Sequence, residues 1–295
     1  MKPHVALPLA AAVLMTVIAC SRDNTTHAIE TGTASAEAQP PAPGANAATP
    51  NVVTITATNY KFDAPASIPA GLTTIRLVDN AGLHQATLLR LTDGKTVADL
   101  GKALQKPGPM PSWVIPSGGP NPPHPNGGVA EVTQTLVPGN YAIICFVPDP
   151  DGTPHFVKGM ISPLTVTPMS AASAAEPVAD VVVTMSDYSY KFSTPLTAGK
   201  HVIRVDNTGP QLHELFLARL APGKTAGELA AWVDKQAGPP PAEPMGGVSM
   251  LPPGGHAYIP VDLTPGQYGI FCFEPDAKDG KPHAAHGMME QITVK

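Results

Sequence analysis

The sequence predicts an all-β protein with two tandem Greek-key β-sandwiches, each carrying one short helix insertion. Apolar and polar residues alternate over short segments, as at 53–58, where Val53, Ile55 and Ala57 alternate with threonines. A turn of the form Leu-x-Pro-Gly-x-Tyr occurs at 136–141 and again at 263–268. This turn resembles the tyrosine corner of Greek-key proteins. The 295 residues suffice for two ordinary domains.

The first 50 residues are set apart by their composition. Residues 1–19 combine Lys2 with an apolar stretch that is too short to span a bilayer comfortably, which predicts a secretion signal. The stretch ends in Val-Ile-Ala-Cys, which resembles the bacterial lipobox, so we expect cleavage before Cys20 and lipidation of that cysteine; an ordinary signal peptide is the alternative. Residues 20–50 have almost no large apolar side chain and are predicted to form a flexible tether.

These features predict a lipid-anchored protein of the bacterial cell envelope. Cys20 is followed by Ser21 rather than by an aspartate, and in this respect the chain resembles lipoproteins that are sorted to the outer membrane. The protein would then face either the periplasm or the exterior. Removing residues 1–19 removes one lysine, so the mature chain has 17 basic residues (18 − 1) against 23 acidic ones. This acidic balance gives no reason to expect a nucleic-acid partner.

Elements of the first domain, residues 51–168, follow one another in a regular order. Strands are expected around 53–58, 74–78, 85–91, 129–136 and 161–167. Thr96 and Asp99 form a capping signal for a short helix that Pro107 ends. The Pro- and Gly-rich connection that runs on to Gly128 is long for a compact domain, and we expect it to cover a site or to dock a partner.

After a linker at 169–177, the same order recurs in a second domain, residues 178–295. Tyr190-Lys191-Phe192 matches Tyr60-Lys61-Phe62 at an offset of 130 (190 − 60). Asp206 matches Asp79 at an offset of 127 (206 − 79). A period of this length indicates a duplicated domain, because solenoid repeats are much shorter.

Each copy contains four residues whose side chains suit copper. A cysteine at the end of an apolar run is followed by a Pro-containing loop, a histidine and then a methionine, and a further histidine lies upstream. One thiolate, two imidazoles and a weak thioether suit an ion that cycles between Cu(I) and Cu(II). The candidate ligands are His84, Cys145, His155 and Met160 in the first copy, and His213, Cys272, His283 and Met288 in the second.

With this ligand order, the strand pattern and the tyrosine corner, each half resembles a cupredoxin, the β-sandwich of blue copper proteins. The resemblance implies one copper per domain, with the cysteine and both histidines equatorial and the methionine axial. The sequence departs from small blue copper proteins in one respect: nine residues separate Cys145 from His155, and ten separate Cys272 from His283. In this respect it resembles copper nitrite reductases.

Two functions are compatible with these residues. The first is a membrane-tethered electron carrier that serves a redox partner protein. The second is a copper-buffering, copper-handling or interaction protein without redox turnover. No enzyme is expected, because the chain has no His-x-His pair, and Ile144 and Phe271, rather than histidines, precede the two cysteines. A disulfide between Cys145 and Cys272 is the alternative to their role as ligands.

Overall fold

The computed structural model describes residues 49–106, 108–169 and 174–295. The predicted signal, Cys20, nearly all of the tether and residues 170–173 of the linker lie outside the described residues. The described residues form one compact unit. No helix among the described residues is long and apolar enough to cross a membrane.

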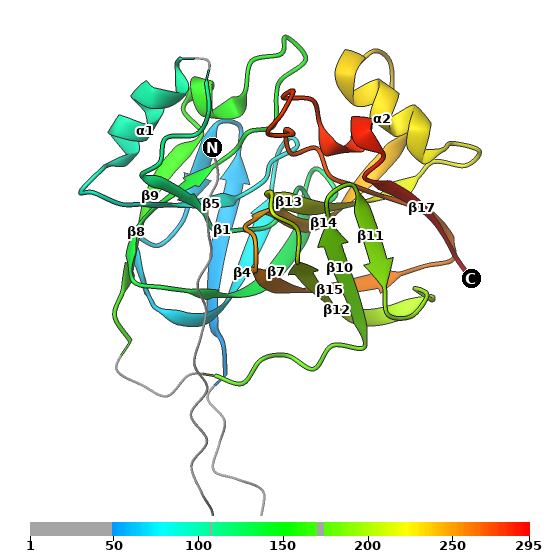
Figure 1. Ribbon diagram of the computed structural model, residues 1–295, viewed down its shortest axis with the longest axis horizontal. Coiled ribbons are helices and arrows are strands. Elements are labelled where there is room, and N and C mark those ends of the chain that lie inside the picture. The colour runs from blue at the N-terminus through cyan, green and yellow to red at the C-terminus, as the bar shows by residue number, and fades with distance from the viewer. Residues whose placement is uncertain (1–48, 107, 170–173) are drawn as a thin grey trace, which may run out of the picture. The chain divides into compact units, whose positions relative to one another are not determined.

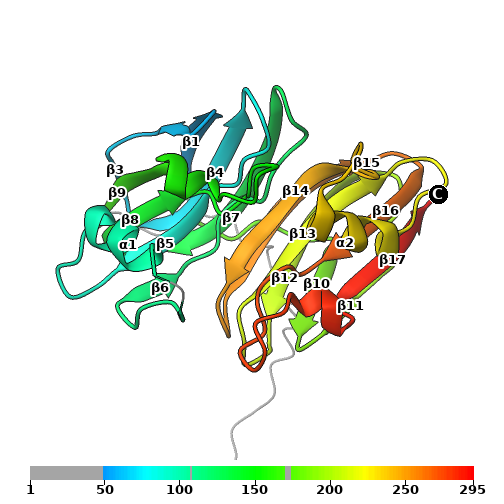
Figure 2. The same ribbon diagram turned by 90° about the horizontal axis from the view of Figure 1, so that it is seen from above.

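Strands of the first sandwich form two layers, which Figure 2 shows face to face. One layer has the order β7-β4-β1-β2, with β1 parallel to β4, and the other has the order β3-β9-β8-β5-β6. The strands are β1 (Asn51–Thr58), β2 (Lys61–Asp63), β3 (Ser67–Pro69), β4 (Gly71–Asp79), β5 (Thr87–Leu91), β6 (Val114–Pro116), β7 (Gly128–Leu136), β8 (Gly139–Ile144) and β9 (Ile161–Thr167).

The second sandwich repeats this layout, including a parallel first pair, β10 with β12. Its layers have the orders β11-β10-β12-β15 and β14-β13-β16-β17 (Figure 1). The first of these layers pairs through β15 with β7, so that it forms one eight-stranded sheet with the β7-β4-β1-β2 layer of the first copy. The strands are β10 (Val181–Ser186), β11 (Ser189–Phe192), β12 (Gly199–Asn207), β13 (His213–Leu220), β14 (Ala242–Leu251), β15 (His256–Leu263), β16 (Gly266–Phe271) and β17 (Met289–Val294). The predicted fold class is therefore confirmed, whereas the exact domain limits at 168 and 178 stay a prediction.

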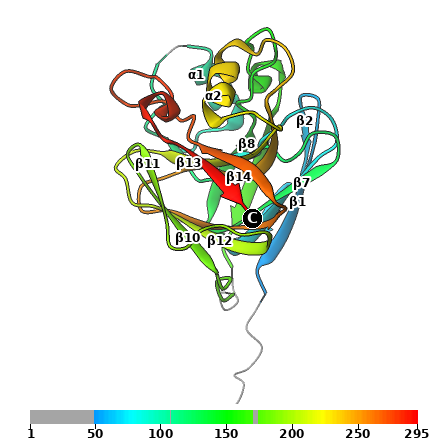
Figure 3. The same cartoon turned by 90° about the vertical axis from the view of Figure 1, so that its right-hand side faces the viewer.

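The same two local hydrogen-bonded motifs, a helix capping box and a tyrosine corner, occur in both copies. Helices α1 (Val97–Leu104) and α2 (Ala226–Lys235) each begin with a full capping box, formed by Thr96 with Asp99 and by Thr225 with Glu228. Figure 3 shows α2 beside the layer that contains β13 and β14. Both tyrosine corners are present, since Tyr141 donates to the Val137 carbonyl at 2.8 Å and Tyr268 donates to the Thr264 carbonyl at 2.9 Å.

The first strands of the two copies repeat at an offset of 128, which differs from the offsets of the sequence matches. Strand β4 runs from 71 to 79 and β12 from 199 to 207, an offset of 128 (199 − 71). Ala57 pairs with Phe62 in the first copy, and Met185 pairs with Tyr190 in the second. Tyr188, rather than Tyr190, therefore corresponds to Tyr60, and Asn207 corresponds to Asp79. The Tyr-Lys-Phe match was misleading because the two identical tripeptides are out of register by two residues when the copies are compared in the fold.

The long connection after α1 docks onto the second sandwich. Its segment 117–122 exchanges backbone hydrogen bonds with residues 246–250, the corresponding part of the second copy: Ser249 donates to the Gly119 carbonyl at 2.9 Å, and Asn121 donates to the Gly247 carbonyl at 3.1 Å. The Thr87 and Ser249 hydroxyls also meet at 2.9 Å. Of the two roles expected for this connection, docking is the one observed, and its partner is the other half of the same chain.

Candidate metal centres

A short loop between two paired strands carries three of the candidate ligands in each copy. Strand β8 leads into Cys145, and β9 begins directly after Met160. Backbone hydrogen bonds close the loop: the Cys145 amide donates to the Met160 carbonyl at 3.2 Å, and the Met160 amide donates to the His155 carbonyl at 3.0 Å. The corresponding bonds of Cys272 and Met288 have the same lengths, 3.2 and 3.0 Å. The strand pair therefore sets the spacing of the ligands.

A glycine before each methionine permits the loop to turn. The single-turn 3-10 helices His155–Lys158 and His283–His286 each end at a glycine in the left-handed region, Gly159 at φ 105° and Gly287 at φ 98°. Residues with a Cβ are disfavoured in that conformation. The Gly-Met pairs in the sequence thus reflect the backbone geometry that returns the chain to the site.

In the first copy the predicted ligand atoms converge. The Nδ1 atoms of His84 and His155 are 3.1 Å apart, and Cys145 Sγ lies 3.4 Å from His155 Nδ1. His84, Cys145 and Met160 have no exposed surface, and His155 is 5% exposed. Met160 packs in the same apolar cluster as Cys145. The structure thus brings the three N and S donors together.

The second copy repeats this arrangement. The Nδ1 atoms of His213 and His283 are 3.0 Å apart, and Cys272 Sγ lies 3.8 and 3.4 Å from them. All four candidate ligands, including Met288, have no exposed surface. In each copy the histidine and cysteine ligand atoms lie within 4.8 Å of one another.

The other ring nitrogen of three histidines is held by an oxygen atom. His84 Nε2 lies 2.6 Å from the Ala81 carbonyl, and His213 Nε2 lies 2.9 Å from an Asp187 oxygen. His155 Nε2 lies 3.2 Å from an Asp149 oxygen. Each contact favours a proton on Nε2, which leaves the Nδ1 lone pair facing the sulfur and the other ring.

Residues outside the predicted ligand set complete this support. Tyr60 donates to Asp149 at 2.7 Å, and its ring meets that of His155 edge-on at 5.3 Å. Tyr188 bonds Asp276 and meets His283 at 5.5 Å. No role was assigned to Asp149 or to these tyrosines from the sequence. The sequence carries no sign of this role. In the fold, both tyrosines have positive φ, 62° and 65°.

Burial sets the protonation of the donors. Desolvation raises the pKa of the Cys145 thiol to about 12 and raises the pKa of the Cys272 thiol beyond the usual range. Desolvation lowers the pKa of His155, His213 and His283. Without a metal, burial therefore favours the neutral form of these three imidazoles and the protonated form of both thiols, and a metal ion that binds must displace the thiol proton.

The donor set fits copper. At metal–ligand distances of about 2.0–2.3 Å, three N and S donors in a trigonal plane lie about 3.6 Å from one another. The observed separations of 3.0–3.8 Å are close to this value. A thiolate with two imidazoles and a methionine is the set that a copper redox site uses. Cys145 and Cys272 are both free, so the alternative of a disulfide between them is wrong.

The layered topology, the tyrosine corners and these two donor clusters occur together in each half of the chain. The fold is cupredoxin-like. This confirms the resemblance predicted from the sequence, and the donor chemistry identifies a copper-binding protein. The number of coppers per chain and the identity of the individual ligands stay predictions.

Several solved structures are similar to part or most of this chain. Auracyanin A, a "blue" copper protein from Chloroflexus aurantiacus, is 25% identical over 40% of this chain and 100% of its own, with a TM-score of 0.28. A copper nitrite reductase from Nitrosomonas europaea is 14% identical over 84% of this chain and 94% of its own, with a TM-score of 0.23. A multicopper oxidase is 12% identical over 83% and 88%, with a TM-score of 0.23. No protein-family model matches the chain, and no curated protein matches it.

The expectation that the protein is not an enzyme is corrected by this comparison. Structures similar to this chain include a multicopper oxidase, a laccase and a copper nitrite reductase, which are enzymes. The missing His-x-His pair and the residues before the cysteines are local features, and a cupredoxin-like pair of domains is compatible with redox enzymes as well as with carriers. At these TM-scores the likeness itself carries no argument for any particular reaction.

Proposed function

We propose that the protein is an electron-transfer protein with one type 1-like copper site in each sandwich. The observation that carries this proposal is the donor cluster present twice, with two histidine Nδ1 atoms and a cysteine sulfur within 4.8 Å of one another in a buried setting. Bound copper would supply a one-electron redox couple. The residues of the chain hold the donors in place before any metal arrives, which reduces the rearrangement that accompanies a change of charge.

Several contacts support this reading. The Glu214 amide donates to Cys272 Sγ at 3.4 Å, and such a bond stabilises negative charge on the sulfur. The apolar residues around each thiol exclude water. Of the eight candidate ligands, His155 alone has exposed surface, so its edge is the proposed point of approach for a redox partner protein.

The proposal includes the location predicted from the sequence. A lipid anchor on Cys20 would hold the folded residues near a membrane, in our proposal the bacterial outer membrane, by way of the tether at 20–50. Replacing Cys20 by serine is expected to move the protein from the membrane fraction to the soluble fraction of fractionated cells. Unchanged membrane association of that variant would contradict the lipid anchor.

A redox cycle in the presence of a competing chelator tests electron transfer against copper buffering. We expect ascorbate to bleach the copper-loaded protein and ferricyanide to restore its colour over several cycles, with bicinchoninate present and no loss of copper. Buffering predicts instead that reduction hands Cu(I) to the chelator. Copper loss in the first cycle would therefore overturn the proposal.

A further inference from the structure

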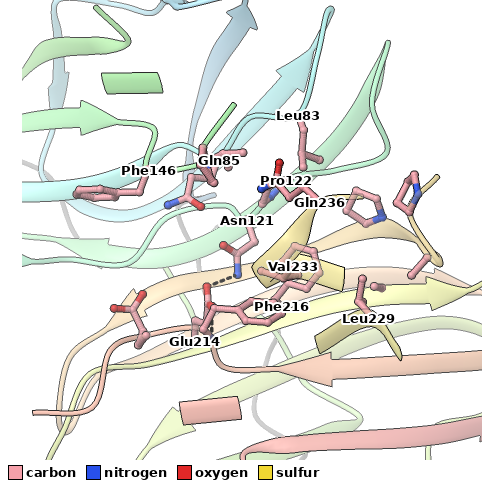
Figure 4. A pocket seen from close by; sticks show the side chains of 18 of the residues that line it. Leu83, Gln85, Asn121, Pro122, Phe146, Glu214, Phe216, Leu229, Val233 and Gln236 are labelled. Carbon is pink, nitrogen blue, oxygen red and sulfur yellow. Dashed lines mark hydrogen bonds between the residues drawn. The ribbon is translucent and has the colours of Figure 1, made fainter. Parts of the chain in front are cut away.

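A third group of metal-ligating side chains lies beside the second copper cluster. Asp276, Asp279 and His286 each bring one ligand atom within 4.8 Å of the other two. His286 Nε2 lies 3.1 Å from Asp279 Oδ1, and Asp276 Oδ2 lies 3.7 Å from His283 Nε2. None of the three is a candidate copper ligand, and none lines the cavity of about 610 Å³ that Figure 4 shows. The group is therefore separate from both.

The three residues have counterparts at the same places in the ligand loop of the first copy, which are Asp149 for Asp276, Asp151 for Asp279, and Lys158 for His286. Both members of the first pair accept a hydrogen bond from the tyrosine in the turn between the first two strands of their copy. Both members of the second pair accept from the backbone amide two residues further on, at 2.8 and 3.0 Å. Both members of the third pair end the 3-10 helix that begins at a ligand histidine.

The first copy itself holds a cation at this place. Lys158 Nζ contacts the Asp149 carboxylate and lies 3.4 Å from Asp151 Oδ2, so one ammonium group joins the two acidic side chains. The histidine of the second copy offers a nitrogen lone pair there instead. Among the described residues, Lys281 is the one lysine at ion-pair distance from the acidic pair of the second copy. Its Nζ is 3.7 Å from Asp279 Oδ2 and its side chain is 67% exposed, so it does not bridge the pair.

Hydrogen bonds orient Asp276 and leave it able to bind a further cation. Its Oδ2 accepts from Tyr188 and, at 3.1 Å, from Gln211. Its Oδ1 accepts from the Lys278 amide at 2.8 Å. A carboxylate oxygen has two lone pairs, so one lone pair of Oδ1 stays available. Carboxylates that bind metal ions are usually hydrogen-bonded in this way, because the outer partners fix their orientation.

We propose that Asp276, Asp279 and His286 bind a zinc ion, which takes the place of the ammonium group of the first copy. Imidazole nitrogen and carboxylate oxygen are both zinc ligands, and with three protein ligands a water completes the four positions. The side chains of His286 and Asp279 are 30% and 37% exposed, so the ion enters from solvent, and the buried Asp276 is its inner ligand. The ion joins the parts of the loop before and after His283, as Lys158 does on either side of the corresponding histidine.

Zinc titration of the copper-loaded protein by equilibrium dialysis, with magnesium in excess to fill purely acidic surface groups, tests this proposal. We expect the parent to bind one zinc per chain more than His286→Lys, which gives the second loop the side chain of the first. His124→Lys is the control and should leave the zinc count unchanged. His124 is also exposed and lies 3.9 Å from a Glu243 oxygen, but it belongs to no group of three such ligands among the described residues. Equal zinc counts in the parent and His286→Lys would overturn the assignment.

The reciprocal variant creates the site in the first copy. Lys158→His places an imidazole beside Asp149 and Asp151 and should add one further zinc per chain. A variant that gains no zinc would contradict the equivalence of the two loops on which the proposal rests. Zinc should also raise the melting temperature of the parent more than that of His286→Lys, because an ion that binds only the folded state stabilises it. These differences between variants do not depend on what the two copper clusters bind, so they are separate from the proposed electron transfer.

Discussion

At the scale of single residues, the two copper clusters differ in what holds the upstream histidine. His213 Nε2 faces the Asp187 carboxylate, whereas His84 Nε2 faces the Ala81 carbonyl. A carboxylate partner fixes the tautomer and makes the ring a stronger ligand. The second site therefore depends on a side chain that can be removed by mutation, and the first does not.

Asp187→Ala is expected to weaken copper binding at the second site about tenfold, because removal of such a partner typically costs 10–100-fold in affinity. The measurement is a competitive copper titration in a Cys145→Ser chain, in which the second site alone keeps its thiol. The same change in a Cys272→Ser chain is the control and should have no effect. Equal losses in both backgrounds would contradict a role specific to His213.

The ligands could be predicted from the sequence because their order along the chain is itself the signal. A cysteine, a histidine and a methionine on one loop are read directly, and the repeat supplies a second example. Their supports could not be predicted in this way. Tyr60 and Asp149 are 89 residues apart, and Asp187 and His213 are 26 apart, so only the fold shows that they meet.

At the scale of elements, left-handed glycines shape both ligand loops. Gly287 has φ 98°, and a Cβ built there meets nothing within 4 Å, so a substitution would act through backbone strain alone. Gly101, within α1, also has open space around it but is helical. The two glycines thus form a matched pair in which one needs its unusual conformation and the other does not.

Gly287→Ala is expected to lower the free energy of unfolding by about 1 kcal/mol. Gly101→Ala should raise it by about 0.5–1 kcal/mol, because alanine favours the helix. Urea denaturation of the two variants measures both changes. A Gly287→Ala variant as stable as the parent would show that the loop does not require the left-handed conformation.

A histidine on β12 gives the fold a pH dependence away from the copper sites. His201 contacts Asp180 and the Thr197 carbonyl, and the hydrogen bond with Asp180 raises the pKa of His201 in the fold. A raised histidine pKa stabilises the fold below the unfolded value near 6.5, and this stabilisation is lost as pH rises through the folded pKa. His201→Gln should therefore reduce stability at pH 5.5 more than at pH 9 in denaturant titrations. An equal reduction at both values would contradict this linkage.

At the scale of the whole molecule, the duplicated halves are joined by corresponding segments. Gly119 and Gly247 both have positive φ, and a Cβ on either would lie within 2.2 Å of a backbone carbonyl oxygen, that of Ala86 or Leu215, two residues after the upstream histidine. The two Gly-Gly pairs are visible in the sequence at an offset of 128 (247 − 119), but the backbone pairing of these two repeats with each other is a tertiary contact. Sequence reasoning therefore found the docking segment and missed what it docks onto.

The buried hydroxyls of Thr87 and Ser249 should couple the two halves. Thr87→Val and Ser249→Ala are each expected to destabilise the protein by about 1–2 kcal/mol. The double variant should be less destabilised than the sum of the two by about 1 kcal/mol, because both changes remove the same bond. Strict additivity in this double-mutant cycle would contradict a direct contact between these groups.

Copper titration of the purified protein, followed by visible absorption and electron paramagnetic resonance, tests the central claim most directly. Cys145→Ser and Cys272→Ser are titrated alongside. Two type 1-like sites predict an intense thiolate-to-copper band that reaches its maximum at two coppers per chain and falls by about half in each variant. A colourless protein, or copper bound without thiolate character, would contradict the account.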